Sequence, residues 1–502
     1  MTTRTVKALK GATTSIIQYS VLVVMQVLLA PIVLKVAGQE VLGAYSIVMQ
    51  IIGYGLLLDL GLSVAVGRYL SQSFNSGAKN SNFSEIFNIG RYFTIATNLI
   101  FSFILLMLSY SIEQFISGSP ETIVDARKGI YLLAIWTFIR APLLLYGHGL
   151  VATQNMAAAN IIGLIGGVIR AALSLYLISS DFGLIGLVGA NIASELIVLL
   201  LQKRQFNKLY PTIMLQWRPP DDKLLKEIFS FGSTYWGVNV AIVLTTGSDS
   251  LIVGHLYGVA AAAVFYTTKI PAFLFIQLIY KISDNSAPAI NELIAQGMYE
   301  NVRAAYIKIL RYSLLVAVPL ALGIVAFNEA VISAWVGPNQ YAGNVMTIAL
   351  SCFVITQVVN HINAMVILAA GKMRYWVLIS VIAGCTTILL GYTLGKYFGF
   401  QWVMVSIAIL DIPVFVFLMQ RSFSSIKITY VNALREAVWP ALKAASPLLT
   451  LVFILNMLHL PYSLRNLIVT ICVYLIMFAA GLYRYGINAN ERQFLFNRLL
   501  SK

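Results

Sequence analysis

Eight charged side chains interrupt long apolar stretches of this 502-residue sequence. Four of them are basic, namely Arg140, Arg170, Lys269 and Lys281. The other four are acidic, namely Asp59, Glu195, Asp249 and Asp411. Inside a membrane, a charge of this kind costs about 2.5–3.5 kcal/mol on insertion scales, so it usually faces a cavity or a partner of opposite charge. These eight residues are therefore the candidate functional residues.

The four basic residues allow two interpretations. They can bind an anionic substrate, because Arg offers paired hydrogen-bond donors and Lys a compact charge. They can instead pair with the buried acids and hold helices together. For Lys281 the second interpretation is favoured, because Asp284 follows three residues later on the same helical face.

The four acidic residues also allow two interpretations. A desolvated carboxylate can exchange protons or bind a cation, which is the chemistry of a coupling site. The alternative is an ion pair with one of the four basic residues. The sequence leaves both interpretations open.

The composition determines the class of protein. Residues of the types AVILMFWYC make up 59% of the chain, charged residues make up 11%, and the mean hydropathy is +0.82. Soluble domains carry roughly 25% charged residues, so a soluble globule is excluded. We expect an all-α polytopic membrane protein.

A helix needs about 20 mainly apolar residues to cross the hydrocarbon core. Fourteen segments meet this requirement, at 14–36, 42–69, 89–111, 129–151, 156–177, 183–201, 229–255, 259–287, 305–327, 342–370, 375–397, 399–420, 438–459 and 463–485. In the fifth, the glycines of Gly163-Leu-Ile-Gly-Gly predict close helix packing.

The distribution of Lys and Arg between these spans predicts the orientation. If the N-terminus is cytoplasmic, the inner segments hold 24 basic residues and the outer segments five. Such an asymmetry is the positive-inside signature of membrane proteins. We therefore expect both termini in the cytoplasm, and we read the net charge of +15 as a topology signal and not as a nucleic-acid surface.

A weak internal repeat predicts two lobes. Glu195 follows Gly183 by twelve residues in the sixth span, and Asp411 follows Gly399 by twelve residues in the twelfth. Six spans per copy bring both copies in from the same side, as in a duplicated transporter. The predicted parts are an N-terminal six-helix lobe, a cytoplasmic linker with an amphipathic helix that begins at Asp221 or Asp222, a C-terminal six-helix lobe, and two additional helices with a cytoplasmic tail. Their boundaries are 1–205, 206–228, 229–422 and 423–502.

Three motifs carry a resemblance to a known family. They are the Gly-x-x-x-x-Gly-x-Tyr element at 38–45, the segment DLGLSVAVGRY at 59–69, and the pair FSFG at 229–232 and DSLIVGHLYG at 249–258. Together they resemble the polysaccharide transporter (Wzx-type) branch of the multidrug/oligosaccharidyl-lipid/polysaccharide exporter superfamily. Members of that branch move lipid-linked oligosaccharides, carried on undecaprenyl diphosphate, to the outer leaflet.

The resemblance implies a flippase that works by alternating access in a bacterial or archaeal plasma (inner) membrane. Arg140, Arg170, Lys269 and Lys281 would then bind the diphosphate. In some flippase relatives a sodium site lies in the C-terminal lobe, and Asp249 with Asn360 or Asn363 and Thr386 or Thr387 would resemble it. The implied partners are a polyprenyl-diphosphate-linked oligosaccharide, membrane lipid and a polysaccharide polymerase. No cofactor is expected beyond coupling to H⁺ or Na⁺ and the membrane potential.

Two other functions remain as alternatives. One is a cation-coupled multidrug exporter of the same superfamily, although such an exporter needs mainly acidic groups in its cavity. The other is a membrane enzyme of polysaccharide assembly such as a polymerase, although the short outer segments disfavour it. An ATP-driven pump is not expected, because no G-x-x-x-x-G-K-[ST] loop is present. The three cysteines lie in apolar runs and form no metal motif.

Overall fold

The structure is a computed structural model that describes residues 3–75, 80–211, 222–458 and 464–486. Every regular element in these ranges is helical, which confirms the predicted all-α class. The helices are α1 (Thr3–Val36), α2 (Gln39–Gly53), α3 (Gly55–Leu58), α4 (Leu62–Asn75), α5 (Asn80–Ser111), α6 (Pro120–Arg140), α7 (Leu144–Ala152), α8 (Met156–Ser179), α9 (Gly183–Leu209), α10 (Asp222–Thr246), α11 (Asp249–Ala295), α12 (Tyr299–Val336), α13 (Asn344–Ala369), α14 (Arg374–Phe398), α15 (Trp402–Ile426), α16 (Tyr430–Ala433), α17 (Trp439–Leu458) and α18 (Leu464–Gly481).

Thirteen helical stretches of the described chain are long and apolar enough to cross a membrane. One of them, Asp222–Ile294, is 73 residues long and contains two of the predicted spans, 229–255 and 259–287. Within it α10 ends before α11 begins, and Gly258 has non-helical dihedral angles (φ 83°, ψ 168°). The observed stretches therefore agree with the predicted fourteen spans. The cytoplasmic placement of the termini stays a prediction.

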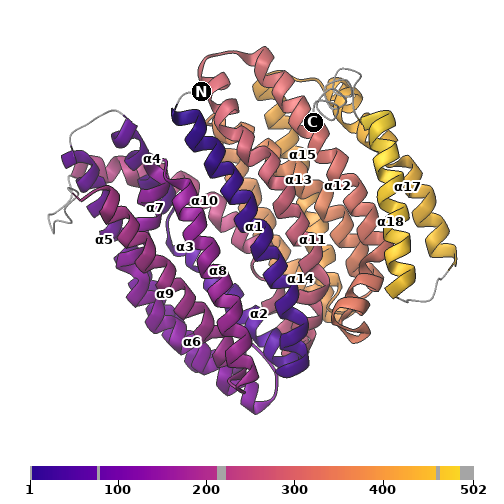
Figure 1. Cartoon of the computed structure of the whole chain (residues 1–502), viewed down its shortest axis with the longest axis horizontal. Helices are drawn as coiled ribbons and strands as arrows, with labels where there is room; N and C mark the ends of the chain where they lie inside the picture. Colours follow the sequence, from indigo (N-terminus) through magenta and orange to yellow (C-terminus); the bar gives the residue numbers. More distant parts are fainter. Residues whose placement is uncertain (1–2, 76–79, 212–221, 459–463, 487–502) are drawn as a thin grey trace. The chain divides into compact units, whose positions relative to one another are not determined.

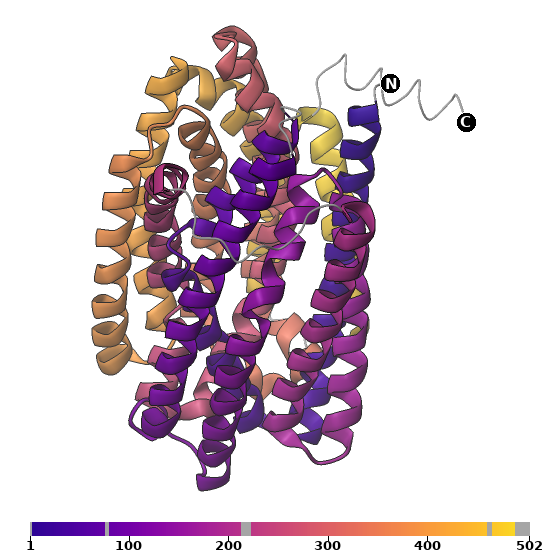
Figure 2. The same ribbon diagram turned by 90° about the vertical axis from the view of Figure 1, so that its left-hand side faces the viewer.

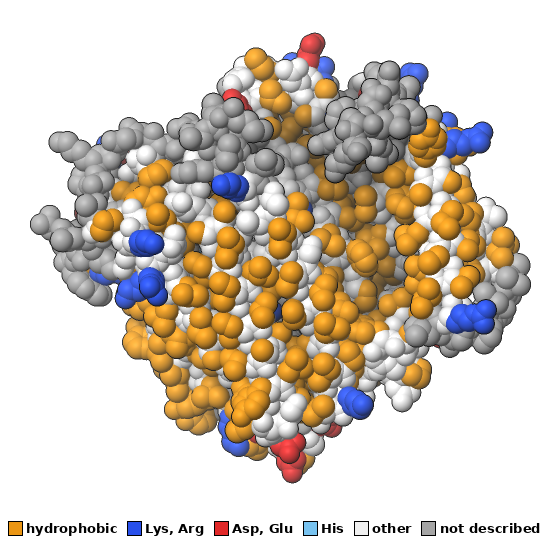
Figure 3. Space-filling view, in the orientation of Figure 1, with side chains coloured by type: hydrophobic (Ala, Val, Ile, Leu, Met, Phe, Trp, Pro, Cys, Tyr) orange, Lys and Arg blue, Asp and Glu red, His pale blue; other side chains and the backbone are white. Residues whose placement is uncertain are grey.

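Large apolar side chains cover the outer surfaces of these helices. On α5, Phe103 is 61% exposed and Met107 is 52% exposed, and on α14 Leu389 is 70% exposed. Figure 3 shows hydrophobic side chains spread along the helices and Lys and Arg side chains gathered toward helix ends. Exposed apolar area on this scale in a soluble monomer would mark an interaction surface. Here it matches the hydrocarbon of a bilayer.

The chain forms two compact units. The first contains residues 1–266 and 380–396, and the second contains residues 267–379 and 397–502. The segment 380–396 of α14 is tied to the first unit through Tyr257 of α11, whose hydroxyl donates to the carbonyl oxygen of Gly395 at 2.7 Å. Figures 1 and 2 show the long helices of the first unit running side by side.

The predicted boundaries at 205, 228 and 422 stay a prediction. Residues 212–221 of the predicted linker, including Asp221, lie outside the described residues, as does the predicted tail at 487–502. The described part of the predicted amphipathic helix begins at Asp222 and is continuous with the rest of α10.

Within the first unit, α8 packs against both α1 and α9 through small residues. A Cβ atom on Gly163 would lie 2.3 Å from Nε2 of Gln18, and one on Gly167 would lie 1.9 Å from Cδ2 of Leu22, both on α1. A Cβ on Gly166 would lie 2.1 Å from Cγ2 of Val198 on α9. The prediction that these glycines permit close helix packing is confirmed.

The predicted second span, 42–69, is divided by a break in the helix. The backbone leaves helical geometry at Leu60 (φ 51°) and Gly61 (φ 68°), which separates α3 from α4. The packing of α10 on the break explains it. A Cβ on Gly61 would lie 2.1 Å from the carbonyl oxygen of Gly232, and the indole N–H of Trp236 donates to the carbonyl oxygen of Leu57 at 2.5 Å.

The break generates a stability prediction. Gly61→Ala is expected to lower the free energy of unfolding by about 1–3 kcal/mol, because it overpacks a rigid backbone contact and places Ala at a positive φ. The matched control is Gly67→Ala in α4, where an added Cβ meets nothing within 4 Å. Thermal unfolding of the purified protein in detergent checks both variants. Equal midpoints for the two would show that the close approach of α10 does not constrain the break.

In the second unit, α12 packs against α13 and α15 and against the two C-terminal helices α17 and α18. The hydroxyl of Tyr306 in α12 donates to Oδ1 of Asn363 in α13 at 2.7 Å. The two added C-terminal helices reach α12 through a cluster that includes Leu448, Val452 and Tyr474. The hydroxyl of Tyr474 also donates to the carbonyl oxygen of Pro319 at 2.5 Å. The predicted additional helices are thus an integral part of this unit.

Candidate functional site

Arg140 and Glu195 form an ion pair inside the first unit. Nη1 of Arg140, the last residue of α6, lies 2.9 Å from Oε1 of Glu195 on α9. The indole N–H of Trp136, one turn earlier in α6, donates to Oε2 of the same carboxylate at 2.6 Å. The two charged side chains are 17% and 26% exposed. For these two residues the predicted alternative of an ion pair is the geometry found, and each carboxylate oxygen accepts a hydrogen bond.

Arg170 lies in a different environment. It is partly buried on α8, and it interacts electrostatically with the hydroxyls of Tyr45 on α2 and Tyr266 on α11. The hydroxyl of Tyr266 accepts a hydrogen bond from Nε2 of Gln26 on α1 at 3.3 Å. In the described part of the chain, no carboxylate lies within ion-pair distance of Arg170. Its guanidinium therefore has phenolic neighbours and no counter-charge.

The two predicted lysines lie on α11 within the second unit. Lys269 is 8% exposed, and its Nζ lies 5.5 Å from the centre of the Phe273 ring. Nζ of Lys281 lies 3.2 Å from Oδ2 of Asp284. Oδ1 of that aspartate lies 2.8 Å from Nε2 of His361 on α13. The predicted pairing of Lys281 with Asp284 is confirmed.

Asp249 connects two helices of the first unit. It is the first residue of α11 and is 2% exposed. Its Oδ1 accepts hydrogen bonds from Nε2 of Gln50 on α2 and from the backbone N–H of Ser250, each at 2.6 Å. Oε1 of Gln50 in turn accepts from the backbone N–H of Leu251 at 3.0 Å. A carboxylate at a helix N-terminus is stabilised by the free backbone N–H groups there, so this geometry fits a structural role.

The residues that the resemblance groups with Asp249 bind elsewhere. Asn360 donates to Asp411 and Asn363 accepts from Tyr306. The hydroxyls of Thr386 and Thr387 donate to carbonyl oxygens of their own helix, α14. The implied sodium site stays a prediction.

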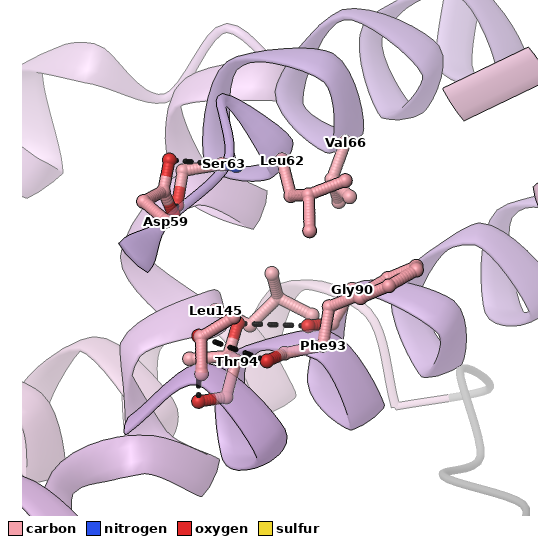
Figure 4. Close-up of a pocket in the computed structure, with 9 residues that line it drawn as sticks. Asp59, Leu62, Ser63, Val66, Gly90, Phe93, Thr94 and Leu145 are labelled. Atoms are coloured by element: carbon pink, nitrogen blue, oxygen red, sulfur yellow. Dashed lines mark hydrogen bonds between the residues drawn. The ribbon is translucent and has the colours of Figure 1, made fainter. Parts of the chain in front are cut away.

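Asp59 lies at the helix break and caps α4. Its Oδ1 accepts from the hydroxyl of Ser63 at 2.5 Å, and its Oδ2 accepts from the backbone N–H of Ser63 at 3.4 Å. Figure 4 shows these two residues on one side of a small pocket, facing Phe93 and Thr94 of α5. His148 of α7 also interacts electrostatically with Asp59. The break thus exposes a carboxylate to a small hollow with both polar and apolar walls.

Asp411 is a buried acid that accepts hydrogen bonds from amides. It lies on α15 and is 3% exposed. Its Oδ1 accepts from Nε2 of Gln357 at 2.9 Å and from Nδ2 of Asn360 at 3.0 Å, both on α13. Within the described residues, no Lys, Arg or His lies within 4 Å of this carboxylate.

Sequence reasoning missed the polar partners of these charges. The sequence patterns single out none of Trp136, Gln357, Tyr280 and His361. The hydroxyl of Tyr280 donates to Oε1 of Gln357 at 3.0 Å, and its ring stacks on His361 with 3.8 Å between ring centres. A usable signal was present, because Gln357 and Asn360 are amides three residues apart within one apolar span.

The fold and its buried charges define a polytopic membrane protein with the architecture of the MOP superfamily transporters. An inward-facing multidrug resistance MATE family transporter of that superfamily superposes with a TM-score of 0.67 at 15% identity, over 83% of this chain and 99% of the other. A MOP superfamily transporter from Pyrococcus furiosus superposes with a TM-score of 0.63 at 14% identity, over 84% and 96% of the two chains.

The chain belongs to the polysaccharide biosynthesis protein family, whose model matches residues 35–346. It is also similar to the teichuronic acid biosynthesis protein TuaB of Bacillus subtilis, with 24% identity over 199 residues. That alignment covers 38% of this chain, and the chain spans only 40% of the length of this relative. The predicted family resemblance is confirmed, and the chain is a multi-pass membrane protein with a bacterial homologue.

The Arg140–Glu195 pair generates a second stability prediction. Glu195→Gln is expected to lower the free energy of unfolding by about 1–3 kcal/mol, because a half-buried guanidinium loses its counter-charge. Adding Arg140→Gln to that variant is expected to restore part of the loss, since the uncompensated charge is then removed. Thermal unfolding of the two single variants and the double variant measures the coupling. Strictly additive effects would contradict the pair as a stabilising contact.

Proposed function

We propose that the protein is a flippase that moves a polyprenyl-diphosphate-linked oligosaccharide from the cytoplasmic to the outer leaflet by alternating access, for surface polysaccharide biosynthesis. Membership of the polysaccharide biosynthesis protein family supports the pathway. The similarity of the fold to solved MOP superfamily transporters supports transport and not catalysis. The oligosaccharide and its diphosphate carrier are proposed as the substrate.

The environment of Arg170 is the observation that carries the proposal. A cation in a membrane helix is costly, and it is normally balanced by an acid or by a ligand. Arg140 and Lys281 already have carboxylate partners, whereas the described chain places no carboxylate within ion-pair distance of Arg170. A guanidinium beside two phenols is suited to a diphosphate, because Arg binds phosphate through paired hydrogen bonds.

Lys269 and the two paired cations, Arg140 and Lys281, complete the proposed set. Lys269 is buried on α11 and supplies a compact second charge. Arg140 and Lys281 would have to exchange their carboxylate partners for the substrate, which makes them weaker candidates than Arg170. The acids Asp59, Glu195, Asp249 and Asp411 would serve either coupling or ion pairing.

The membrane potential supplies a driving force in this proposal. An inside-negative potential favours outward movement of negative charge by about 2.3 kcal/mol per charge per 100 mV. A diphosphate carries about two charges, so transport needs no ATP. We place the protein in a bacterial or archaeal plasma membrane, with a polysaccharide polymerase as the partner that receives the flipped substrate.

The first test of the proposal is the variant Arg170→Gln. It is expected to reduce flipping at least tenfold, because a loss of about 1.4 kcal/mol of binding is already a factor of ten. Arg170→Lys is expected to retain part of the activity, since it keeps the charge and loses only the paired geometry. The measurement is the fraction of lipid-linked oligosaccharide that an impermeant glycan-oxidising label reaches in cells.

The matched control is Arg127→Gln, which removes an arginine that is 40% exposed and paired with Glu113. Normal flipping by Arg170→Gln at normal expression would overturn the anionic site. If cells that lack the protein expose the oligosaccharide normally, the flippase proposal fails, and drug-efflux and polymerase assays test the two alternatives.

The second test removes the membrane potential. A protonophore or a potassium ionophore at matched external potassium is expected to lower the flipping rate in spheroplasts, because the outward movement of the diphosphate then loses its electrical term. The same label measures the rate. An unchanged rate after the collapse of the potential and of the cation gradients would exclude both forms of coupling.

A further inference from the structure

Asp411 is a buried carboxylate whose two oxygens are treated unequally. The amides of Gln357 and Asn360 both donate to Oδ1, at 2.9 Å and 3.0 Å. Oδ2 is buried and receives no hydrogen bond in the described structure. The hydroxyl of Thr356 also lies near the carboxylate, but it donates to the carbonyl oxygen of Phe353 at 3.1 Å.

A second buried acceptor without a partner belongs to one of the same residues. Oδ1 of Asn360 receives no hydrogen bond either, although Nδ2 of the same amide donates to Asp411. Asn360 is 6% exposed and Asp411 is 3% exposed, so bulk water does not satisfy either oxygen. A buried polar atom that lacks a partner is destabilising, and here two such atoms belong to side chains that already contact each other.

A single proton would satisfy both atoms. We propose that Asp411 binds a proton on Oδ2 and donates it to Oδ1 of Asn360, so that the two side chains form a cyclic carboxylic acid–amide pair. In such a pair the amide N–H donates to one carboxyl oxygen and the carboxyl O–H donates to the amide oxygen. The first of these bonds is the observed one from Nδ2 of Asn360 to Oδ1 of Asp411.

The orientation of Gln357 supports this assignment. The hydroxyl of Tyr280 on α11 donates to Oε1 of Gln357, which fixes Nε2 as the group that points at Asp411. Oδ1 of Asp411 therefore has two donors, and Oδ2 is the oxygen that is left for the proton. The site is built from three helices, α11, α13 and α15, all within the second unit.

The internal repeat strengthens the argument. Glu195 and Asp411 occupy the same place in the two copies, twelve residues after Gly183 and Gly399. In the first copy Arg140 balances the charge of Glu195. In the second copy the neighbouring helix supplies the two amides and no cation, so an ionised Asp411 would be a buried and uncompensated charge. A proton on Asp411 removes the negative charge in this copy, as Arg140 balances that of Glu195 in the other.

The titratable groups around the site are compatible with a proton on Asp411. From α11, Tyr280 interacts electrostatically with Asp411, and the Lys281–Asp284 pair lies one turn further along the helix. From α13, His361 contacts Asp284. From α12, the hydroxyl of Tyr306 donates to Asn363. None of these groups forms an ion pair with Asp411 in the described part of the chain.

The coupling role of the site rests on the proposed function, because a proton that is taken up and released here would couple transport to the proton gradient. The occupancy of the site itself is independent of any substrate. The test therefore uses the full-length purified protein in lipid nanodiscs without substrate, and infrared spectroscopy at several pH values.

The expected result is a C=O stretching band of a protonated carboxyl group at neutral pH, which shifts in D₂O and disappears in Asp411→Asn. This variant keeps the shape of the pair, because an amide replaces the acid. Asn360→Leu is expected to keep the band but to shift it to higher frequency, because the carboxyl O–H loses its acceptor. The matched control is Asp249→Asn, which removes an equally buried carboxylate that accepts from Gln50 and is expected to leave the band unchanged.

Three results would overturn the proposal. The first is a band that survives in Asp411→Asn, and the second is its absence from the wild type at every pH at which the protein is folded. The third is a band that is present in choline buffer and lost in sodium buffer at the same pH, because Na⁺ would then be the occupant. If Asp411→Asn cannot be purified, the frequency shift in Asn360→Leu decides the question. A confirmed band in a protein that does not flip lipid-linked oligosaccharide would separate this site from the proposed function.

Discussion

The cost of placing a charge inside an apolar helical bundle governs the internal organisation of this protein. Each buried charge with a defined environment meets that cost in its own way. Glu195 is neutralised by Arg140, whereas Asp249 accepts hydrogen bonds from an amide and from a backbone N–H at a helix start. Asp59 caps a broken helix. Among the described residues, Arg170 has no carboxylate within 4 Å, and Asp411 has a buried oxygen that receives no hydrogen bond. For these reasons the two residues carry the functional proposals.

The two units solve the same problem with different chemistry. In both copies of the repeat, an acid follows by twelve residues the glycine that begins the last span of the copy. In the first copy the neighbouring helix α6 supplies Arg140 and Trp136, and the acid becomes a structural ion pair. In the second copy α13 supplies Gln357 and Asn360, and the acid stays available for a proton. Duplication followed by divergence of a partner helix would thus convert one packing contact into a titratable site.

Backbone irregularity in this protein occurs where two helices approach closely. The break at Leu60 and Gly61 lies against the backbone of Gly232 on α10, and it brings the carboxylate of Asp59 to a small hollow with both polar and apolar walls. Broken helices within membranes are tolerated where other protein segments satisfy the released backbone groups. The indole of Trp236 does so for the carbonyl oxygen of Leu57. A transporter that must change conformation can use such a break as a hinge, in keeping with the proposed alternating access.

Composition and residue pattern alone predict the class of the protein, the number and approximate limits of its spans, and the eight charges that matter. These follow from composition and periodicity, because a bilayer demands continuous apolar helices and makes every interruption conspicuous. The pairing of Lys281 with Asp284 was also predictable, since both residues lie on one helix face.

Which of the charges have a partner of opposite charge follows from the tertiary structure and not from the sequence pattern. Arg140 and Glu195 are 55 residues apart and Asp411 and Asn360 are 51 apart, and no local rule relates such positions. The break at Leu60 was equally unpredictable, because it depends on the contact between Gly61 and α10 and not on local propensity. The physical reason is common to all three. The environment of a side chain inside a helical bundle consists of residues from distant parts of the chain, and the packing of the helices determines which residues these are.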